Sequence, residues 1–290
     1  MSRLGIFVDR KTLSSAGQLH ALIRCRDTAE SLGHAAEFLF PADIRKIPRM
    51  DALFIRARTD PLNVTYVAAR IAQSHGIPVI DDPDSIRICS DKVNMYAHLQ
   101  RSGVRIPATL FFSKREINPG RVREIFAELG APLILKEPST SFSLRVEKVA
   151  DPAAFLRVAR RFIRMSDWIV AQQFIESRFD WRVGVLDGEL LYVCKYTIPE
   201  TGFKIQDQVN GHTVYCDVKS IPAQEAPAQV IELGIDAARA IGDGLYGVDL
   251  KTSNGDCCVI EVNDNPSLEG GEDLCYPAVY ERIITHLLGA

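Results

Sequence analysis

Short apolar runs alternate with helical patterns over the first 88 residues or so, and this alternation limits the fold more than any other feature. Leu4–Val8 is a continuous apolar run that ends at Asp9, as expected for a strand buried in a parallel sheet. The same alternation continues with helical spacing at 18–32 and 64–74 and strand patterns at 35–40, 52–55 and 78–80. The sequence therefore predicts a small α/β layer over residues 1–88.

Beyond this region the pattern changes to strand pairs that flank single helices. Such pairs are typical of an antiparallel sheet with helices packed on one face, so we predict an α+β arrangement. Helices are expected at 91–103, 122–129, 153–163, 226–240 and from 278, and strands at 109–112, 132–136, 144–149, 168–174, 181–186, 190–196, 213–218, 246–251 and 257–262.

The composition is that of an ordinary globular protein. The chain has 290 residues, enough for two compact units, with 47% apolar and 24% charged residues. A net charge of −3 gives no overall attraction to nucleic acid or anionic lipid. The seven cysteines are scattered without a C-x-x-C pair, and no apolar run reaches the roughly 18 residues of a membrane span. We expect a cytoplasmic protein with no nucleic-acid or membrane partner.

Three oxygen-bearing side chains near the end of the chain form the most informative pattern. Glu261 and Asn263 lie two apart on a predicted strand, so they share one face, and Asp249 lies on the preceding strand. Two carboxylates and an amide are hard oxygen ligands of the kind that Mg²⁺, or Mn²⁺, prefers. The other interpretation is a solvated hairpin with its polar residues outside. These three residues alone support the metal site and the solvated hairpin about equally.

The turn between these strands decides whether the three side chains meet. Asn254-Gly255 is the strongest short hairpin signal, but a two-residue turn without a compensating bulge would put Asp249 and Glu261 on opposite faces. An odd loop, Ser253-Asn254-Gly255 with a left-handed Gly255, would bring all three to one face. We predict the odd loop.

The residues that follow favour the metal interpretation. Glu261 to Pro266 resembles the metal-binding E-V-N-x-x-P signature of ATP-grasp enzymes, and Leu268-Glu269-Gly270 resembles the continuation in RimK-type glutamate ligases. The likeness runs from about Asp51 to the C-terminus. It implies an ATP-grasp fold with a pre-ATP-grasp α/β domain at 1–88 and an ATP-grasp domain at 89–290, divided into a small mobile lobe at about 107–172 and a C-terminal lobe at about 173–290. The additional N-terminal domain of RimK-like relatives is expected to be missing.

The resemblance also implies a nucleotide site that binds ATP with one or two Mg²⁺. Asp249, Glu261 and Asn263 would hold the metal, and Lys92 and Lys136 would bind the α- and β-phosphates. The hinge would bind adenine through its backbone and cover the base with apolar side chains, and the acidic residue after it would bind the ribose. The matching positions are Gln172, Gln173, Phe174 and Ile175 for the hinge and Asp180 for the ribose.

The resemblance assigns the remaining catalytic positions as well. Arg182, Lys195 and Lys204 match cations near the γ-phosphate and the acyl phosphate, although a lone arginine on an alternating strand is more often exposed to solvent. The backbone N–H of Ser267 would steady the oxyanion. The loop 138–145 has no glycine where relatives have a glycine-rich phosphate loop, so it covers ATP differently or binds it weakly.

The implied activity is the ATP-dependent joining of a carboxylate to an amine through an acyl phosphate, such as glutamate added to an amino acid, peptide or protein. A kinase with a small hydroxylated acceptor and a catalytically degenerate nucleotide-binding protein are the alternatives. Arg56 and Arg58 end a predicted strand of the α/β layer, where an arginine can bind an acidic substrate, although a solvent-facing loop is the other interpretation. Relatives are commonly homo-oligomers, and a homo-oligomer is compatible with this chain.

Overall fold

The computed structural model describes residues 1–140, 144–198, 206–209, 212–215 and 217–289. Its helices are α1 Arg10–Ser14, α2 Ala16–Ser31, η1 Pro41–Arg49, α3 Val64–Ser74, α4 Pro83–Cys89, α5 Lys92–Arg101, η2 Lys114–Glu116, α6 Pro119–Leu129, α7 Pro152–Phe162, η3 Ala223–Glu225, α8 Ala228–Arg239 and α9 Val279–Leu288. Its strands are β1 Arg3–Phe7, β2 Ala35–Leu39, β3 Ala52–Ile55, β4 Val79–Ile80, β5 Thr109–Ser113, β6 Leu133–Lys136, β7 Val146–Val149, β8 Trp168–Gln173, β9 Phe179–Leu186, β10 Glu189–Thr197, β11 Gln206–Val209, β12 His212–Tyr215, β13 Val218–Ser220, β14 Leu245–Ser253 and β15 Asp256–Asn263.

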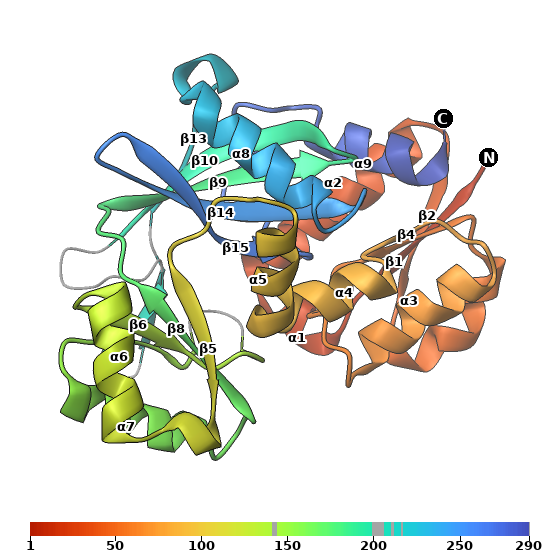
Figure 1. Ribbon diagram of the computed structural model, residues 1–290. Coiled ribbons are helices and arrows are strands. Elements are labelled where there is room, and N and C mark those ends of the chain that lie inside the picture. The colour runs from red at the N-terminus through yellow and green to blue at the C-terminus, as the bar shows by residue number, and fades with distance from the viewer. Residues whose placement is uncertain (141–143, 199–205, 210–211, 216, 290) are drawn as a thin grey trace.

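The N-terminal part forms the predicted parallel sheet, with strand order β2-β1-β3-β4 (Figure 1). The segment Asp81-Asp82-Pro83, which has the composition of a turn, instead starts helix α4. Asp82 caps this helix by accepting the backbone N–H groups of Asp84 and Ser85, and Pro83 occupies the first helical position, where its missing N–H costs nothing. The α/β expectation for this region is confirmed, with α1, η1 and α4 as additional helices.

The middle of the chain forms an antiparallel sheet of order β5-β8-β6-β7. Helices α6 and α7 cover one face, where Phe112, Leu133, Leu135, Phe155 and Ala171 form a buried core (Figure 1). Because side chains alternate along a strand, the residues between these core positions face the other way, toward the third sheet. This open face supplies one wall of the cleft described below.

The third sheet has the order β13-β10-β9-β14-β15, and α8 packs on one of its faces. The last helix, α9, lies against α2 of the N-terminal part (Figure 1). One hydrophobic core joins residues of both regions, including Leu4 and Ile6 of the first sheet with Leu245 of the third and Ile283 of α9. The C-terminal end therefore stabilises the position of the N-terminal sheet relative to the third sheet.

The hairpin that carries the predicted metal ligands differs from our prediction. Ser253 pairs with Asp256, so the turn has only two residues, Asn254 and Gly255, with φ angles of 52° and 88°. The predicted odd loop is wrong. A β-bulge compensates for the two-residue turn, because Leu250 pairs with Val259 while Asp249 pairs with Glu261, which leaves Ile260 as the additional residue. Asp249, Glu261 and Asn263 therefore share one face after all.

The turn offers a direct test of this register. Gly255→Ala is expected to lower the free energy of unfolding by about 1 kcal/mol, because an L side chain disfavours the left-handed backbone that Gly255 adopts. No atom lies within 4 Å of a Cβ added there, so a clash adds nothing to this cost. Denaturant unfolding of Gly255→Ala measures the effect. Asn254→Gly is the control and should change the free energy of unfolding by less than about 0.5 kcal/mol. A Gly255→Ala protein as stable as the wild type would contradict the assigned turn.

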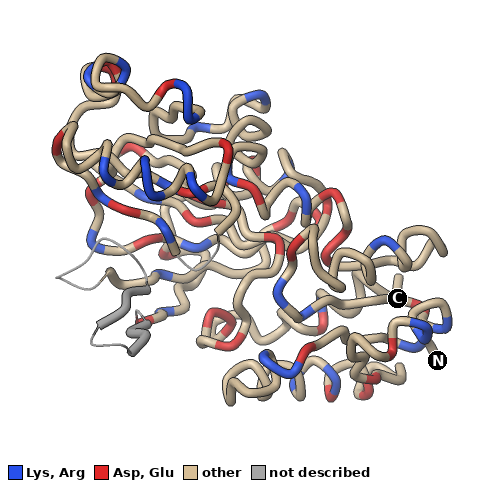
Figure 2. Tube along the Cα trace, turned by 90° about the horizontal axis from the view of Figure 1, so that it is seen from below, with Lys and Arg blue, Asp and Glu red and all other residues tan. Residues whose placement is uncertain are grey.

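Two further features concern the described part of the chain. None of the described helices has the length and apolar character needed to cross a membrane. Lys and Arg are interspersed with Asp and Glu along the chain (Figure 2).

Candidate active site

A solvent-accessible cleft that contains about 720 Å³ of open space lies between the second and third sheets. Asp249 and Glu261 line it, and four further side chains, Ile134, Val146, Lys251 and Ile260, complete its walls. All seven residues predicted to bind the nucleotide line the same cleft, namely Lys92, Lys136, Gln172, Gln173, Phe174, Ile175 and Asp180. The structure thus brings together residues that are up to 169 positions apart, from Lys92 to Glu261.

Lys92 connects three parts of the cleft. It is the first residue of α5, whose N-terminus is capped by the Asp91 carboxylate. Its ammonium lies 3.1 Å from Glu261 Oε1 and donates a short hydrogen bond to the carbonyl of Thr140 in the glycine-free loop. Residues 141–143 of that loop lie outside the described residues, so the way the loop covers ATP stays a prediction.

Lys136 is held by a residue that the sequence analysis missed. The lysine ends β6 and is 5% exposed, and its Nζ donates to Tyr96 Oη at 2.6 Å. Tyr96 in turn donates to the carbonyl of Ile260, also at 2.6 Å. Ile260 is the bulge residue, so Tyr96 supplies a partner for a carbonyl at the point where the strand ladder is irregular. In the sequence Tyr96 is indistinguishable from the other apolar positions of its helix.

Burial and neighbouring charges set the protonation of these groups. Burial lowers the pKa of Lys136 to about 8, although Glu261 and Asp180 oppose this by attraction. Burial acts to raise the pKa of Glu261, but the Lys92 and Lys136 ammonium groups outweigh it and hold this pKa below its ordinary value. Glu261 is therefore a carboxylate at neutral pH, as a metal ligand must be.

The pKa of Lys136 predicts a pH dependence. Below a pH of about 8 the ammonium is charged and attracts phosphate, and above it the charge is lost, so nucleotide affinity should fall by up to about tenfold per pH unit above 8. Titrations of ADP binding between pH 6.5 and 9.5 test this expectation. Lys136→Met should bind more weakly at pH 7 and lose the step near pH 8, whereas the same step in Lys136→Met would assign it to another group.

Asp249 is held by an arginine as well as by the hairpin. The Asp249 carboxylate accepts two hydrogen bonds from Arg182, from Nε at 2.7 Å and Nη2 at 2.8 Å, and both side chains are 8% exposed. Asn263 Nδ2 donates to Asp249 Oδ2 and to the carbonyl of Gly247, both at 3.1 Å. Arg182, predicted beside the γ-phosphate, thus forms a buried ion pair with a predicted metal ligand.

The donor set on this face fits magnesium. It consists of two carboxylates and an amide oxygen, and Mg²⁺ takes few protein ligands together with water and substrate phosphates. In the described part of the chain, no three His, Cys, Asp or Glu side chains form a metal site by themselves. A metal held by Asp249, Glu261 and Asn263 would therefore complete its coordination with oxygens from water or from a substrate.

Lys251 is the second residue that the sequence analysis missed. It lines the cleft from β14, and its ammonium forms a short ion pair with Asp180 Oδ1, the predicted ribose ligand. Burial raises the pKa of Asp180 to about 6, and the Lys251 ammonium opposes that rise. A usable signal was present, because Lys251 lies two positions after Asp249 on a strand and so shares its face.

Comparisons with known proteins agree with this cleft. Residues 89–287 match the profile of the RimK-like ATP-grasp domain, which is more than half of the chain. The chain belongs to the RimK-like ATP-grasp family. It is 26% identical to a probable alpha-L-glutamate ligase of Shewanella denitrificans over 94% of both chains. It is also 26% identical to the ribosomal protein bS6–L-glutamate ligase of Escherichia coli, over 90% of this chain and 89% of that one.

Solved structures agree on the ATP-grasp fold at lower identity. The structure of the D-alanine–D-alanine ligase of Bacillus anthracis complexed with ATP superimposes with a TM-score of 0.73 at 17% identity. The superposition covers 99% of this chain and 96% of the ligase chain. An ATP-grasp RimK domain protein of Sphaerobacter thermophilus gives a TM-score of 0.68 at 19% identity. The predicted ATP-grasp fold and membership of the carboxylate–amine ligase family are confirmed.

The other predicted catalytic positions of this ATP-grasp protein are Lys195, Lys204 and Ser267. Lys195 pairs directly with Trp181, so it points to the face opposite Arg182, and its ammonium lies 4.3 Å from the centres of the Phe179 and Trp181 rings. This placement takes Lys195 out of the cleft. Lys204 lies outside the described residues. Ser267 is partly buried and accepts a hydrogen bond from Tyr192 Oη at its carbonyl, which leaves its N–H role a prediction.

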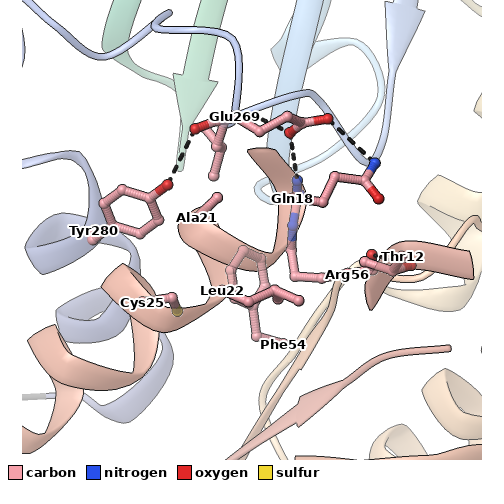
Figure 3. A pocket seen from close by; sticks show the side chains of 10 residues that line it. Thr12, Gln18, Ala21, Leu22, Cys25, Phe54, Arg56, Glu269 and Tyr280 are labelled. Carbon is pink, nitrogen blue, oxygen red and sulfur yellow. Dashed lines mark hydrogen bonds and ion pairs between the residues drawn. The ribbon is translucent and has the colours of Figure 1, made fainter. Parts of the chain in front are cut away.

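Arg56 does not present a free guanidinium to a substrate. It follows β3 and borders a second, smaller pocket together with Gln18 and Glu269 (Figure 3). Its Nη1 donates to Asn265 Oδ1 at 2.6 Å and its Nη2 to the carbonyl of Pro266 at 2.9 Å. The structure thus gives Arg56 an internal contact that fixes the segment before Ser267, and a substrate contact of Arg56 stays a prediction. Arg58 is exposed and lies 3.8 Å from Asp60.

This contact predicts a distinct mutant phenotype. Arg56→Ala should lower the free energy of unfolding by about 2 kcal/mol, because it removes hydrogen bonds from a charged donor that is only 11% exposed. It should also lower kcat, because the segment that carries Ser267 loses its support. Arg58→Ala, at an exposed position, should match the wild type in stability. An Arg56→Ala protein of unchanged stability with only a raised KM for one substrate would restore the substrate-binding role.

Proposed function

We propose that this chain is an ATP-dependent ligase that joins a carboxylate to an amine through an acyl phosphate, with an amino acid such as glutamate as one substrate. The observation that carries the proposal is one cleft that holds two buried lysines, the carboxylates of Asp249 and Glu261, and the hinge segment 172–175 with its apolar Phe174 and Ile175. The glutamate ligases among its relatives support an amino-acid substrate.

Each part of the cleft has a task in this proposal. Lys92 and Lys136 bind the phosphates, and the backbone of residues 172–175 binds adenine between Ile134, Val146 and Ile260. Magnesium held by Asp249, Glu261 and Asn263 would neutralise charge on the β- and γ-phosphates. Lys136 is suited to its task because burial strengthens its attraction for an anion while Tyr96 fixes its position.

The reaction then needs no side-chain nucleophile. A carboxylate oxygen attacks the γ-phosphorus and ADP leaves, which gives an acyl phosphate. The amine attacks the acyl carbon, the backbone N–H of Ser267 stabilises the oxyanion, and phosphate leaves as the nitrogen loses a proton. Closure of the cleft would keep water from hydrolysing the acyl phosphate, and positioning together with electrostatics would supply most of the rate.

A screen for ADP release tests the proposal and separates it from its alternatives. The purified protein is incubated with ATP, Mg²⁺ and pairs of amino acids or short peptides, and products are identified by mass spectrometry. The proposal expects ADP, free phosphate and an amide whose mass equals the sum of both substrates less one water. A phosphorylated product would favour the kinase, and nucleotide binding without turnover across the screen would favour the degenerate protein.

A further inference from the structure

We propose that Lys251 and Asp180 act as a pair that recognises the ribose of the bound nucleotide, so that the cleft selects ribonucleotides over deoxyribonucleotides. The inference rests on the proposed nucleotide site. Its new element is Lys251, since the resemblance assigns a ribose contact to Asp180 alone.

The pair belongs to an alternating arrangement of charges on two neighbouring strands. Strand β9 carries Asp180 and Arg182, and β14 carries Asp249 and Lys251, in each case two positions apart and therefore on one face. Arg182 pairs with Asp249 in the strand register, and Lys251 forms its ion pair with Asp180. The second pair is 10% exposed on both sides, so it is nearly as buried as the first.

Position along the strands places this pair at the nucleoside end of the cleft. Asp249 belongs to the metal face, where the phosphates bind in the proposed function. Lys251 lies two residues further toward the tip of the hairpin, which is about 7 Å along a strand. Asp180 lies just after the hinge segment 172–175, which lines the same cleft. The pair thus lies between the metal face and the hinge, where the sugar of a nucleotide would lie.

The chemistry of the pair matches a vicinal diol. An ammonium has three N–H donors, of which the structure directs one to Asp180, and a carboxylate oxygen accepts hydrogen bonds only. Each ribose hydroxyl can both donate and accept, so one can donate to Asp180 while the other accepts from Lys251. Both charged groups are buried, so a nucleotide that lacks one hydroxyl leaves one of these groups without its hydrogen bond to the sugar. An unpaired buried charge costs free energy, and this cost should favour ribonucleotides over deoxyribonucleotides.

Equilibrium binding of ADP, 2′-deoxy-ADP and 3′-deoxy-ADP in the presence of Mg²⁺ tests the inference without requiring turnover. The wild type should bind ADP at least about tenfold more tightly than either deoxy form. In Lys251→Met this preference should shrink to within about twofold for at least one of them. Lys219→Met, at an exposed lysine of the same sheet, is the matched control and should keep the wild-type preference.

A second variant guards against misfolding, because Lys251→Met leaves the buried Asp180 without its cation. Lys251→Met combined with Asp180→Asn removes both charges and should likewise lose the preference for ADP. Equal binding of ADP and its deoxy forms by the wild type, or an unchanged preference in a folded Lys251→Met protein, would overturn the inference alone. A wild-type protein that binds none of these nucleotides would overturn the proposed function together with it.

Discussion

Glu261→Gln is expected to lower the rate of ADP formation by at least about 100-fold while leaving the protein folded. The amide keeps the shape of the side chain but removes the negative charge that lies 3.1 Å from the Lys92 ammonium and, in the proposed function, holds the metal. The same change makes the cleft more positive. Binding of ADP in the absence of divalent metal should therefore be as tight as in the wild type or tighter, so catalysis and metal-free binding should respond in opposite directions.

Asp256→Asn is the matched control for this prediction. Asp256 begins the same strand β15, but its side chain is 87% exposed at the tip of the hairpin. Its loss should leave both ADP formation and ADP binding unchanged. Two results would contradict the assignment of Glu261 to the metal face: ADP formation in Glu261→Gln at the wild-type rate, or a parallel loss of metal-free ADP binding.

Arg182→Met is expected to lower the free energy of unfolding by about 3 kcal/mol, the second large effect. Removal of one partner from a buried ion pair leaves the other charge without compensation, and Asp249 and Arg182 are both 8% exposed. Combining Arg182→Met with Asp249→Met removes both charges, and Asn263 keeps the carbonyl of Gly247 as an acceptor. The double variant should therefore recover to within about 1 kcal/mol of the wild type, without recovering activity.

Denaturant unfolding in the presence of a chelator measures these stabilities without any contribution from bound metal. Lys219→Met, an exposed cation of the same sheet, should stay within about 0.5 kcal/mol of the wild type. An Arg182→Met protein as stable as the wild type, or a double variant less stable than the single one, would show that Arg182 does not compensate the Asp249 charge.

The hairpin illustrates how far the fold can be predicted from this sequence. The strands that carry Asp249 and Glu261 were predictable from their apolar patterns, and so was the shared face of Glu261 and Asn263, because residues two apart on a strand point the same way. The register was not, because it depends on the bulge at Ile260. That bulge is accompanied by a hydrogen bond from Tyr96, a residue 164 positions away, and no local pattern shows such a contact. The predicted shared face is therefore present, although the predicted turn is wrong.

The same distinction applies to individual site residues. Lys92 and Lys136 were predictable because the resemblance covers their segments, and the structure places both in the cleft. Lys195 was misplaced although its strand contained the needed signal. It is two positions from the buried Val193, so it shares a face with a core residue rather than with Arg182. Lys251 was not predicted, although it lies two positions after Asp249 on the same strand and therefore shares the face of that candidate metal ligand.

The most direct test of the central claim follows oxygen from the carboxylate to phosphate. Amino acids whose carboxyl oxygens have been exchanged with ¹⁸O are incubated with the protein, ATP, Mg²⁺ and an amine partner identified by the ADP screen. Ligation through an acyl phosphate predicts one ¹⁸O atom in each released phosphate, detected by mass spectrometry, and one ¹⁸O atom retained in the new amide carbonyl. Release of unlabelled phosphate, or phosphate that stays on the product, would contradict it.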